Sequence, residues 1–232
     1  MNVIITGASK GIGLAIAKKF ASKGFDLALC SRSIEELDIV ANQLKKEYSI
    51  NVIYKAVDLS KKNEAIDFGN FVLNKWKKID VLINNAGIYI GGEISNEEDG
   101  ALEAMIQSNL YSAYYLTKTI LPKLIENHKG HIINMCSIAS KIAYPNGGSY
   151  SISKFALLGF SKVLREELKT KNIKVTSILP GATWSNSWAG VDLPKDRIMD
   201  AEDIAKVVWS CYDLADNVVV EDITIRPLLG DL

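Results

Sequence analysis

The stretch that decides the fold is Thr6-Gly7-Ala8-Ser9-Lys10-Gly11-Ile12-Gly13, between an apolar run at 2–6 and a helical pattern at 11–23. Glycines permit a tight turn, close approach of a ligand to the backbone, and close packing of helix on strand. The helix start offers free N–H groups and the positive end of its dipole, which suit a pyrophosphate. The spacing is G-x-x-x-G-x-G, and glycine turns also serve plain packing of a strand on a helix. We predict a dinucleotide-binding turn, with contacts from Gly7, Ser9, Lys10, Gly11, Ile12 and Gly13.

Apolar runs and helical patterns alternate along the rest of the chain. The predicted strands span residues 2–6, 25–30, 51–57, 80–83, 131–135, 174–179 and 218–225. The predicted helices span residues 11–23, 33–48, 98–127, 149–170 and 201–215, and a further one ends near 77. Such alternation is typical of βαβ units, so we predict an α/β fold with a doubly wound, Rossmann-type parallel sheet covered on both faces by helices. No break in composition is visible, so we expect one domain over residues 1–232, with a short substrate lid at about 182–200.

Charge and composition exclude several classes of protein. The chain has 232 residues, and 27 basic side chains balance 27 acidic ones, so neither nucleic acid nor an anionic membrane is expected as a partner. No apolar run is long enough to span a membrane, and no signal peptide is visible. Cys30, Cys136 and Cys211 are widely spaced and expected to be reduced, and with His128 and His131 they form no zinc pattern. We expect a cytoplasmic protein without a metal.

The residues after the second predicted strand distinguish the two nicotinamide cofactors. NAD-binding units carry a carboxylate there for the ribose 2′-OH, whereas this chain has Ser31-Arg32-Ser33. Arg32 can pair bidentately with a 2′-phosphate, and Lys10 is a second cation in the neighbouring turn. The alternative is that both are solvated surface charges. We predict NADP(H) rather than NAD(H), and we expect Ser33 to begin the next helix with Glu36 as its capping-box partner.

Three further residues suggest a reaction. Tyr150 and Lys154 are four residues apart, on one face of a predicted helix, and Ser137 follows the strand 131–135. Parallel sheets bind ligands at the carboxyl ends of their strands. Reduction of a carbonyl by hydride needs a proton on the carbonyl oxygen. A tyrosine can deliver that proton when a nearby ammonium lowers the pKa of its phenol. A serine hydroxyl can hold the carbonyl oxygen in place by a hydrogen bond. A Tyr-x-x-x-Lys pair is common by itself, so this prediction depends on the nucleotide turn.

Together these motifs resemble the short-chain dehydrogenase/reductase family in its compact form, and within it the 3-oxoacyl reductase-like and sepiapterin reductase-like members. The likeness covers nearly all of the chain. The TGxxxGxG turn of the family matches residues 6–13, its Asn-Asn-Ala-Gly motif matches residues 84–87, and its Pro-Gly matches residues 180–181. The catalytic tetrad of the family matches Asn109, Ser137, Tyr150 and Lys154. The resemblance implies a seven-stranded sheet in the order 3-2-1-4-5-6-7.

The resemblance also implies roles for single residues. Asp58 and Leu59 would contact the adenine. Lys154 would hold the nicotinamide ribose as well as tuning Tyr150, and Asn109 would hold a proton relay behind Lys154 through a helix carbonyl and a water. The remaining cofactor contacts would be Asn85, Ala86, Gly87, Pro180, Gly181 and Thr183.

We therefore predict an NADP(H)-dependent oxidoreductase acting on CH–OH groups, which interconverts a carbonyl and an alcohol. Hydride would pass to or from nicotinamide C4, with Tyr150 as the general acid or base. The alternative is a catalytically silent, nucleotide-binding regulatory protein on the same fold. The family resemblance also implies a homodimer or homotetramer, formed through the helices that end near 127 and start near 149.

The substrate remains open among small molecules: a 3-oxoacyl thioester, a pteridine side chain, a steroid and a small xenobiotic ketone all satisfy the pattern. Loops shape the pocket, and loops vary without revealing their ligand. Trp184, Trp188 and Tyr144 either form an apolar substrate pocket or serve ordinary packing.

Overall fold

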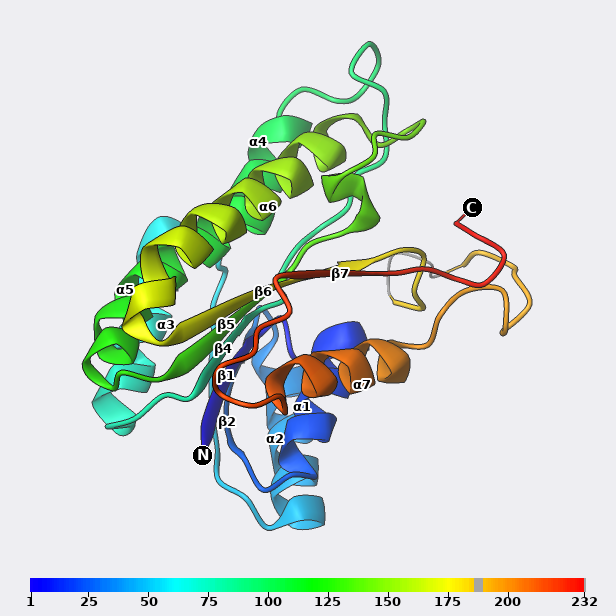
Figure 1. Ribbon diagram of the computed structural model, residues 1–232. Coiled ribbons are helices and arrows are strands. Elements are labelled where there is room, and N and C mark those ends of the chain that lie inside the picture. The colour runs from blue at the N-terminus through cyan, green and yellow to red at the C-terminus, as the bar shows by residue number, and fades with distance from the viewer. Residues whose placement is uncertain (186–189, 232) are drawn as a thin grey trace.

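A seven-stranded parallel sheet forms the centre of the computed structural model, which describes residues 1–185 and 190–231 (Figure 1). The strands are β1 (Asn2–Thr6), β2 (Asp26–Ser31), β3 (Val52–Ala56), β4 (Val81–Asn84), β5 (Gly130–Met135), β6 (Ile173–Pro180) and β7 (Asp222–Ile225). Their order is β3-β2-β1-β4-β5-β6-β7, and each neighbouring pair is parallel. The predicted fold class and strand order are confirmed.

Helices cover both faces of the sheet (Figure 1). One face carries α1 (Gly11–Ala21), α2 (Ile34–Tyr48) and α7 (Ala201–Tyr212). The other carries α3 (Lys62–Lys75), α4 (Ala101–Ile106), α5 (Ser112–Glu126) and α6 (Gly148–Leu168). A π-helical turn, η1 (Gln107–Tyr111), joins α4 to α5, and two short 3-10 turns are η2 (Ile138–Ser140) and η3 (Lys169–Lys171). Within the described ranges, no helix is long and apolar enough to cross a membrane.

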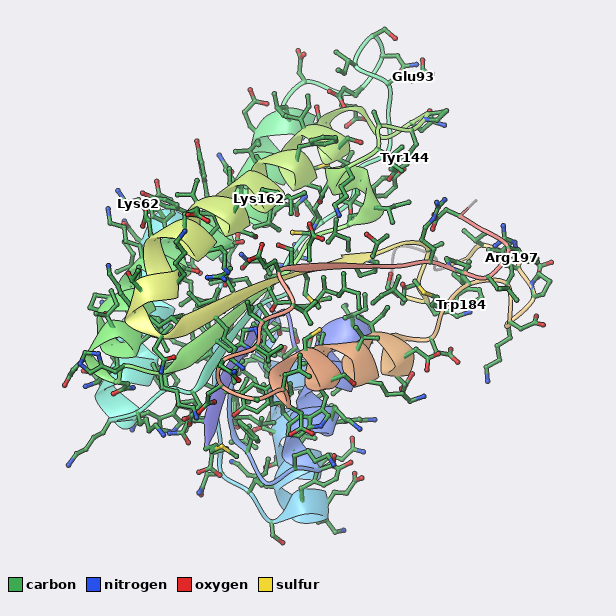
Figure 2. The ribbon with its side chains drawn as sticks, viewed as in Figure 1. Lys62, Glu93, Tyr144, Lys162, Trp184 and Arg197 are labelled. Carbon is green, nitrogen blue, oxygen red and sulfur yellow. The ribbon has the colours of Figure 1, made fainter. Side chains whose placement is uncertain are left out.

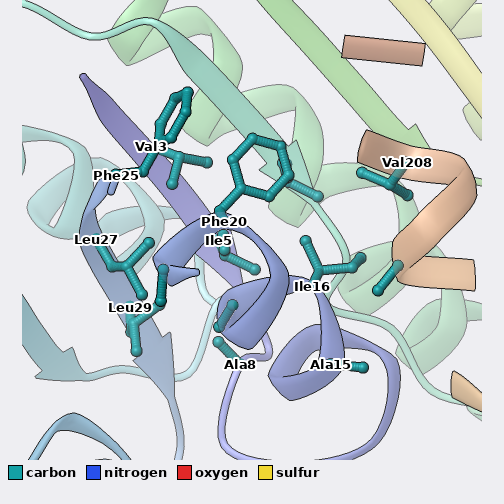
Figure 3. Packing of buried hydrophobic residues seen from close by; sticks show 14 of the residues in the cluster. Val3, Ile5, Ala8, Ala15, Ile16, Phe20, Phe25, Leu27, Leu29 and Val208 are labelled. Carbon is teal, nitrogen blue, oxygen red and sulfur yellow. The ribbon is translucent and has the colours of Figure 1, made fainter. Parts of the chain in front are cut away.

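The apolar face of α1 explains how the first βαβ unit packs. Ile16 and Phe20 are fully buried against the sheet, and Phe20 meets Phe25 edge to face with ring centroids 5.1 Å apart. Figure 3 shows these side chains beside Val3 of β1 and Val208 of α7. Burying one large apolar side chain stabilises a fold by about 2 kcal/mol, so this cluster holds α1, and the turn before it, firmly on the sheet.

The helix ends follow local chemistry. Gly24, after α1, has φ +75°, a left-handed conformation that favours glycine. Ser33 caps α2 as predicted, because its Oγ accepts a hydrogen bond from the Glu36 backbone N–H at 3.1 Å. The second half of the predicted capping box is wrong: the Glu36 carboxylate does not return to the Ser33 N–H but lies 3.4 Å from Lys10 Nζ, directed toward the first turn of the chain.

Two predicted boundaries near the C-terminus are wrong. The last helix ends at Tyr212 and not at 215, because Lys174 Nζ donates hydrogen bonds to the backbone carbonyls of residues 214 and 215, at 3.2 and 2.7 Å. The last strand begins at 222 and not at 218, because the Thr176 hydroxyl donates to the Val220 carbonyl at 2.6 Å. Lys174 and Thr176 both belong to β6. Their side chains bind carbonyls of residues that the periodic pattern had placed in the last helix and the last strand.

The chain topology also determines where a ligand can bind. From β1 the chain moves outward to β2 and β3, and it then returns to the opposite side of β1 as β4. At such a reversal the loops after the two central strands diverge and leave a crevice at the carboxyl edge of the sheet. The turn after β1 and the Asn85-Ala86-Gly87 segment after β4 both lie at this crevice.

Candidate active site

A cavity of about 940 Å³ lies along the carboxyl edge of the sheet. It is lined by residues that follow each of the seven strands, from the first glycine turn to the C-terminal tail. Of the site residues proposed from the sequence, Asn109 is the one that does not line it. The others do: Gly7, Ser9, Lys10, Gly11, Ile12, Gly13, Arg32, Asp58, Leu59, Asn85, Ala86, Gly87, Ser137, Tyr150, Lys154, Pro180, Gly181 and Thr183.

The glycine turn has the shape that a phosphate group needs. Gly7 and Gly11 have φ +62° and +55°, in the left-handed region. A Cβ on Gly13 would lie 2.2 Å from the Gly7 carbonyl oxygen, so a side chain there would collide with the backbone. Lys10 precedes α1 without a side-chain hydrogen bond to it, and the first N–H groups of a helix have no partner inside the helix. This cradle fits the pyrophosphate of a dinucleotide.

Hydrogen bonds hold the turn to the loop after β4. The backbone N–H groups of Asn85 and Ala86 both donate to Thr6 Oγ1 at 2.9 Å. The Asn85 side-chain amide donates to the carbonyls of Thr6 and Gly7, at 2.9 and 3.1 Å. The two loops on either side of the crevice are therefore braced against each other, and both walls of the cavity are fixed.

Ser137 and Tyr150 lie on the same wall, after β5 and in the first turn of α6. Ser137 Oγ accepts from the Ala139 N–H at 3.1 Å, which leaves its own proton to donate to a ligand. Tyr150 packs edge to face on Tyr89, with ring centroids 5.0 Å apart. Within residues 1–185 and 190–231, the Tyr150 hydroxyl makes no hydrogen bond, so it too can meet a ligand oxygen.

Lys154 lies one helical turn after Tyr150 and is 6% exposed. Its Nζ donates to the Met135 carbonyl at 2.9 Å and lies 5.8 Å from the centroid of the Tyr150 ring. An ammonium has three donors, so two remain after the bond to Met135. The ammonium therefore lies beside the Tyr150 ring with donors that can bind ribose hydroxyls.

Asn109 is buried behind this wall, in the π-helical turn η1. Its side chain accepts from the Ile88 N–H at 2.7 Å and donates to the Ile88 carbonyl at 3.0 Å. It also donates to Ser153 Oγ at 2.9 Å, and that hydroxyl donates to the Tyr150 carbonyl at 2.7 Å. Asn109 thus ties the loop after β4 to the turn of α6 that carries Tyr150, and π-helical turns often occur at functional sites.

The opposite end of the cavity, after β2 and β3, is charged. Lys10 and Arg32 supply positive charge, and Glu36 and Asp58 supply negative charge. Burial opposes ionisation of Asp58, but hydrogen bonds from the Ser60 hydroxyl and N–H, together with nearby cations, hold its pKa below the usual value. Glu36 was expected from the sequence to be the capping-box partner of Ser33, and its place on this wall was not predicted.

The described residues just after β6 line the remaining side of the cavity. Met199 forms a short β-bridge to Thr183, and its N–H donates to the Ala182 carbonyl at 3.1 Å. The C-terminal tail lies against the same loop: Asp231 Oδ1 accepts from the Ala182 N–H at 2.7 Å, and Asp231 Oδ2 accepts from Arg226 Nε at 2.6 Å. Asp231 and Arg226 both line the cavity, a contribution for which the sequence had no signal.

The aromatic residues singled out in the sequence separate into three cases. Tyr144 lines the cavity, and burial raises the pKa of its phenol well above the usual value. Trp184 does not line it; its indole N–H donates to the Lys195 carbonyl at 2.8 Å. Figure 2 shows Tyr144 on the loop before α6 and Trp184 near Arg197, on the loop that contacts the tail. Trp188 lies outside the described residues.

Comparisons with known proteins agree with this geometry. The profile of the family described as short chain dehydrogenase matches residues 1–194. An uncharacterized oxidoreductase of Staphylococcus saprophyticus is 31% identical over 225 residues, covering 97% of this chain and 96% of that protein. The sepiapterin reductase of Chlorobaculum tepidum is 30% identical over 238 residues, covering 99% and 97%. A solved alcohol dehydrogenase of Thermococcus sibiricus, complexed with 5-hydroxy-NADP, superposes with a TM-score of 0.92 at 28% identity, covering 100% and 98%.

Proposed function

Since the chain belongs to the short-chain dehydrogenase/reductase family of NAD(P)-dependent oxidoreductases, we propose that it interconverts a carbonyl and an alcohol with NADP(H). One observation carries the proposal: Ser137, Tyr150 and Lys154 line the same cavity as the glycine turn that fits a pyrophosphate. A protein that only bound the nucleotide would have no need of a phenol, an ammonium and an alcohol at the far end of that cavity.

Each of the three residues has a step to perform. Bound NADP(H) supplies or accepts the hydride. Ser137 donates its free proton to the substrate oxygen and so holds the carbonyl in position. Tyr150 transfers a proton to that oxygen during reduction and removes it during oxidation. Lys154, held by the Met135 carbonyl, stabilises the phenolate that forms when the proton has left.

The proposed preference for NADP(H) rests on Lys10 and Arg32. Both line the cavity at the end away from Tyr150, where the adenosine half of the cofactor would lie. A 2′-phosphate is a dianion that a guanidinium binds bidentately and an ammonium binds as a point charge. The bound 5-hydroxy-NADP in the Thermococcus alcohol dehydrogenase supports the same preference here.

The reaction is tested by NADPH oxidation with a panel of diketones and aldehydes, comparing the wild type with Tyr150→Phe. We expect the variant to bind NADPH normally and to turn over about a hundredfold or more slowly, the usual contribution of a general acid. Tyr48→Phe, which removes a phenol hydroxyl at the end of α2, is the matched control. NADPH binding without turnover of any carbonyl would favour a silent, regulatory protein.

The cofactor preference is tested by Arg32→Asp. We expect the ratio of the NADPH and NADH specificity constants to fall by about tenfold or more, because a charge-assisted pair is replaced by repulsion. An unchanged ratio would mean that Arg32 is only a solvated surface charge.

We also propose a homodimer or homotetramer that pairs through α5 and α6. These helices expose large apolar side chains, with Tyr114 at 40%, Ile152 at 43%, Phe155 at 45% and Val163 at 56% exposure. Several large exposed apolar side chains on two neighbouring helices are typical of a protein interface. Sedimentation of the wild type and of Phe155→Glu tests it, and the charged variant is expected to shift toward the monomer.

A further inference from the structure

Glu36 lies beside the two cations that we propose to bind the 2′-phosphate of the cofactor. Its Oε1 lies 3.4 Å from Lys10 Nζ, and the Arg32 charge also acts on it. A hydrogen bond from the Ser9 side chain, assisted by those two charges, holds the pKa of Glu36 below the usual value, so it is ionised at neutral pH. Both Ser9 and Lys10 belong to the nucleotide turn, and all four side chains line the cavity.

The start of α2 does not need this carboxylate. Ser33 caps the helix through the backbone N–H of Glu36, a contact that is independent of the Glu36 side chain. The neighbouring Glu35 carboxylate accepts from the Ser33 hydroxyl at 2.8 Å and does not line the cavity. Two adjacent glutamates therefore face different surroundings, and Glu36 is the one directed to the cations.

A carboxylate in this position acts unequally on the two cofactors. The 2′-phosphate of NADP(H) carries up to about two negative charges, so it is repelled by Glu36 and competes with it for Lys10 and Arg32. The ribose 2′-OH of NAD(H) is neutral and a hydrogen-bond donor, so the carboxylate does not oppose it.

Building on the proposed function, we infer that Glu36 is a specificity-determining residue that lowers the preference for 2′-phosphorylated nucleotides by occupying their cations. The size of the effect follows from exposure. The Lys10 and Glu36 side chains are 53% and 44% exposed, and an exposed ion pair changes an equilibrium constant by about fivefold at most. Glu36 therefore moderates the preference that Lys10 and Arg32 create and does not reverse it.

The test is a binding measurement on the full-length protein. Dissociation constants for NADPH and NADH are measured by fluorescence titration for the wild type, Glu36→Gln and Glu35→Gln. We expect Glu36→Gln to bind NADPH about fivefold more tightly and NADH with less than a twofold change, so that the affinity ratio rises. We expect Glu35→Gln, the adjacent control, to change neither constant by more than about twofold. The gain in Glu36→Gln should shrink as salt is added, because mobile ions screen exposed charges.

The outcomes separate the inference from the proposed function. If the wild type binds both nucleotides but Glu36→Gln leaves their affinity ratio as in Glu35→Gln, or lowers it, the role of Glu36 is overturned and the proposed function stands. If the wild type binds neither nucleotide, both are overturned. The variant Lys10→Met gives an independent check, since the gain from Glu36→Gln should be smaller in that background when the two side chains act on the same phosphate.

Discussion

The Asp231 carboxylate accepts a hydrogen bond from the Ala182 N–H at 2.7 Å, and so the last residues of the chain hold the loop after β6. Asp231 is 16% exposed and is itself paired with Arg226, while Arg197 donates to the Gly230 carbonyl at 2.8 Å. The tail, the loop and the segment before α7 form one bonded unit beside the cavity. A side-chain contact with the tail therefore positions backbone that we propose to face the nicotinamide.

Replacing Asp231 by Ala should weaken this unit. A charge-assisted hydrogen bond contributes about 1.5 to 3 kcal/mol, so we expect the specificity constant for NADPH-dependent reduction to fall by about tenfold or more. Steady-state kinetics with a fixed carbonyl substrate measures it. Asp203→Ala removes an exposed i,i+3 ion pair with Lys206 and should change the constant less than twofold. Wild-type kinetics in Asp231→Ala would show that the loop keeps its shape without the tail.

Gly13→Ala should both destabilise the fold and abolish nucleotide binding. The added Cβ would lie 2.2 Å from the Gly7 carbonyl oxygen, so α1 must move away from the turn. We expect a loss of about 3 kcal/mol or more in the free energy of unfolding, measured by urea denaturation, and no detectable NADPH binding. Gly24→Ala is the control: its Cβ meets nothing within 4 Å, and φ +75° alone should cost about 1 kcal/mol and leave binding intact.

The first turn and the sheet could be predicted because their signals are local. Glycines at 7, 11 and 13 are required by backbone conformation and close contact within a few residues, and the alternation of strands and helices repeats along the chain. The boundaries near the C-terminus failed for the opposite reason. The Thr176 hydroxyl ends the pairing of β7 by binding the Val220 carbonyl, 44 positions away, and a periodic pattern holds no information about such a contact.

Some residues of the candidate site could likewise be predicted from the sequence, and others could not. Ser137, Tyr150 and Lys154 were found from their spacing and their family resemblance, and they line one cavity. Glu36 was predicted to complete a capping box with Ser33, but the observed cap uses only the Glu36 backbone N–H, so the sequence could not show that the side chain faces Lys10. Nothing in the sequence indicated that Asp231 lies at the site, because it does so through a hydrogen bond to the backbone of Ala182, 49 positions earlier in the chain.

Lys154→Met should remove activity while leaving the fold intact enough to bind nucleotide. The buried ammonium is lost, the Met135 carbonyl loses its donor, and the positive charge beside the Tyr150 ring is removed. We expect kcat to fall by about a hundredfold or more and the free energy of unfolding to change by about 1 to 3 kcal/mol. Lys162→Met is the matched control on the same helix, with a side chain that is 67% exposed, and its kcat should match the wild type. Comparable losses in both variants would assign the effect to helix α6 as a whole.

The tautomer of His131 follows from its neighbours. His131 is buried, and its Nε2 lies 2.7 Å from Thr176 Oγ1. That hydroxyl gives its single proton to the Val220 carbonyl at 2.6 Å, so Nε2 must be the donor in the pair. Nδ1 is then a lone-pair acceptor, and among the described residues it has no hydrogen-bond partner. A proton added to Nδ1 would have no acceptor, which makes the charged ring costly.

The free energy of unfolding should therefore fall as the pH is lowered, already above the pH range in which carboxylates titrate. Burial, with a smaller contribution from the Lys174 charge, lowers the pKa of His131 from 6.5 to about 3. As the pH falls, the histidine is protonated in the unfolded state before it is protonated in the folded state. The stability that the neutral folded ring contributes is therefore fully present above pH 6.5 and is lost as the pH falls toward 3. Between pH 7 and 5 this amounts to about 2 kcal/mol in the free energy of unfolding, measured by urea denaturation at each pH. His128→Asn alters the exposed histidine and should keep the full loss. His131→Gln should lose less than half of it, and an equal loss in both variants would mean that other groups carry the pH dependence.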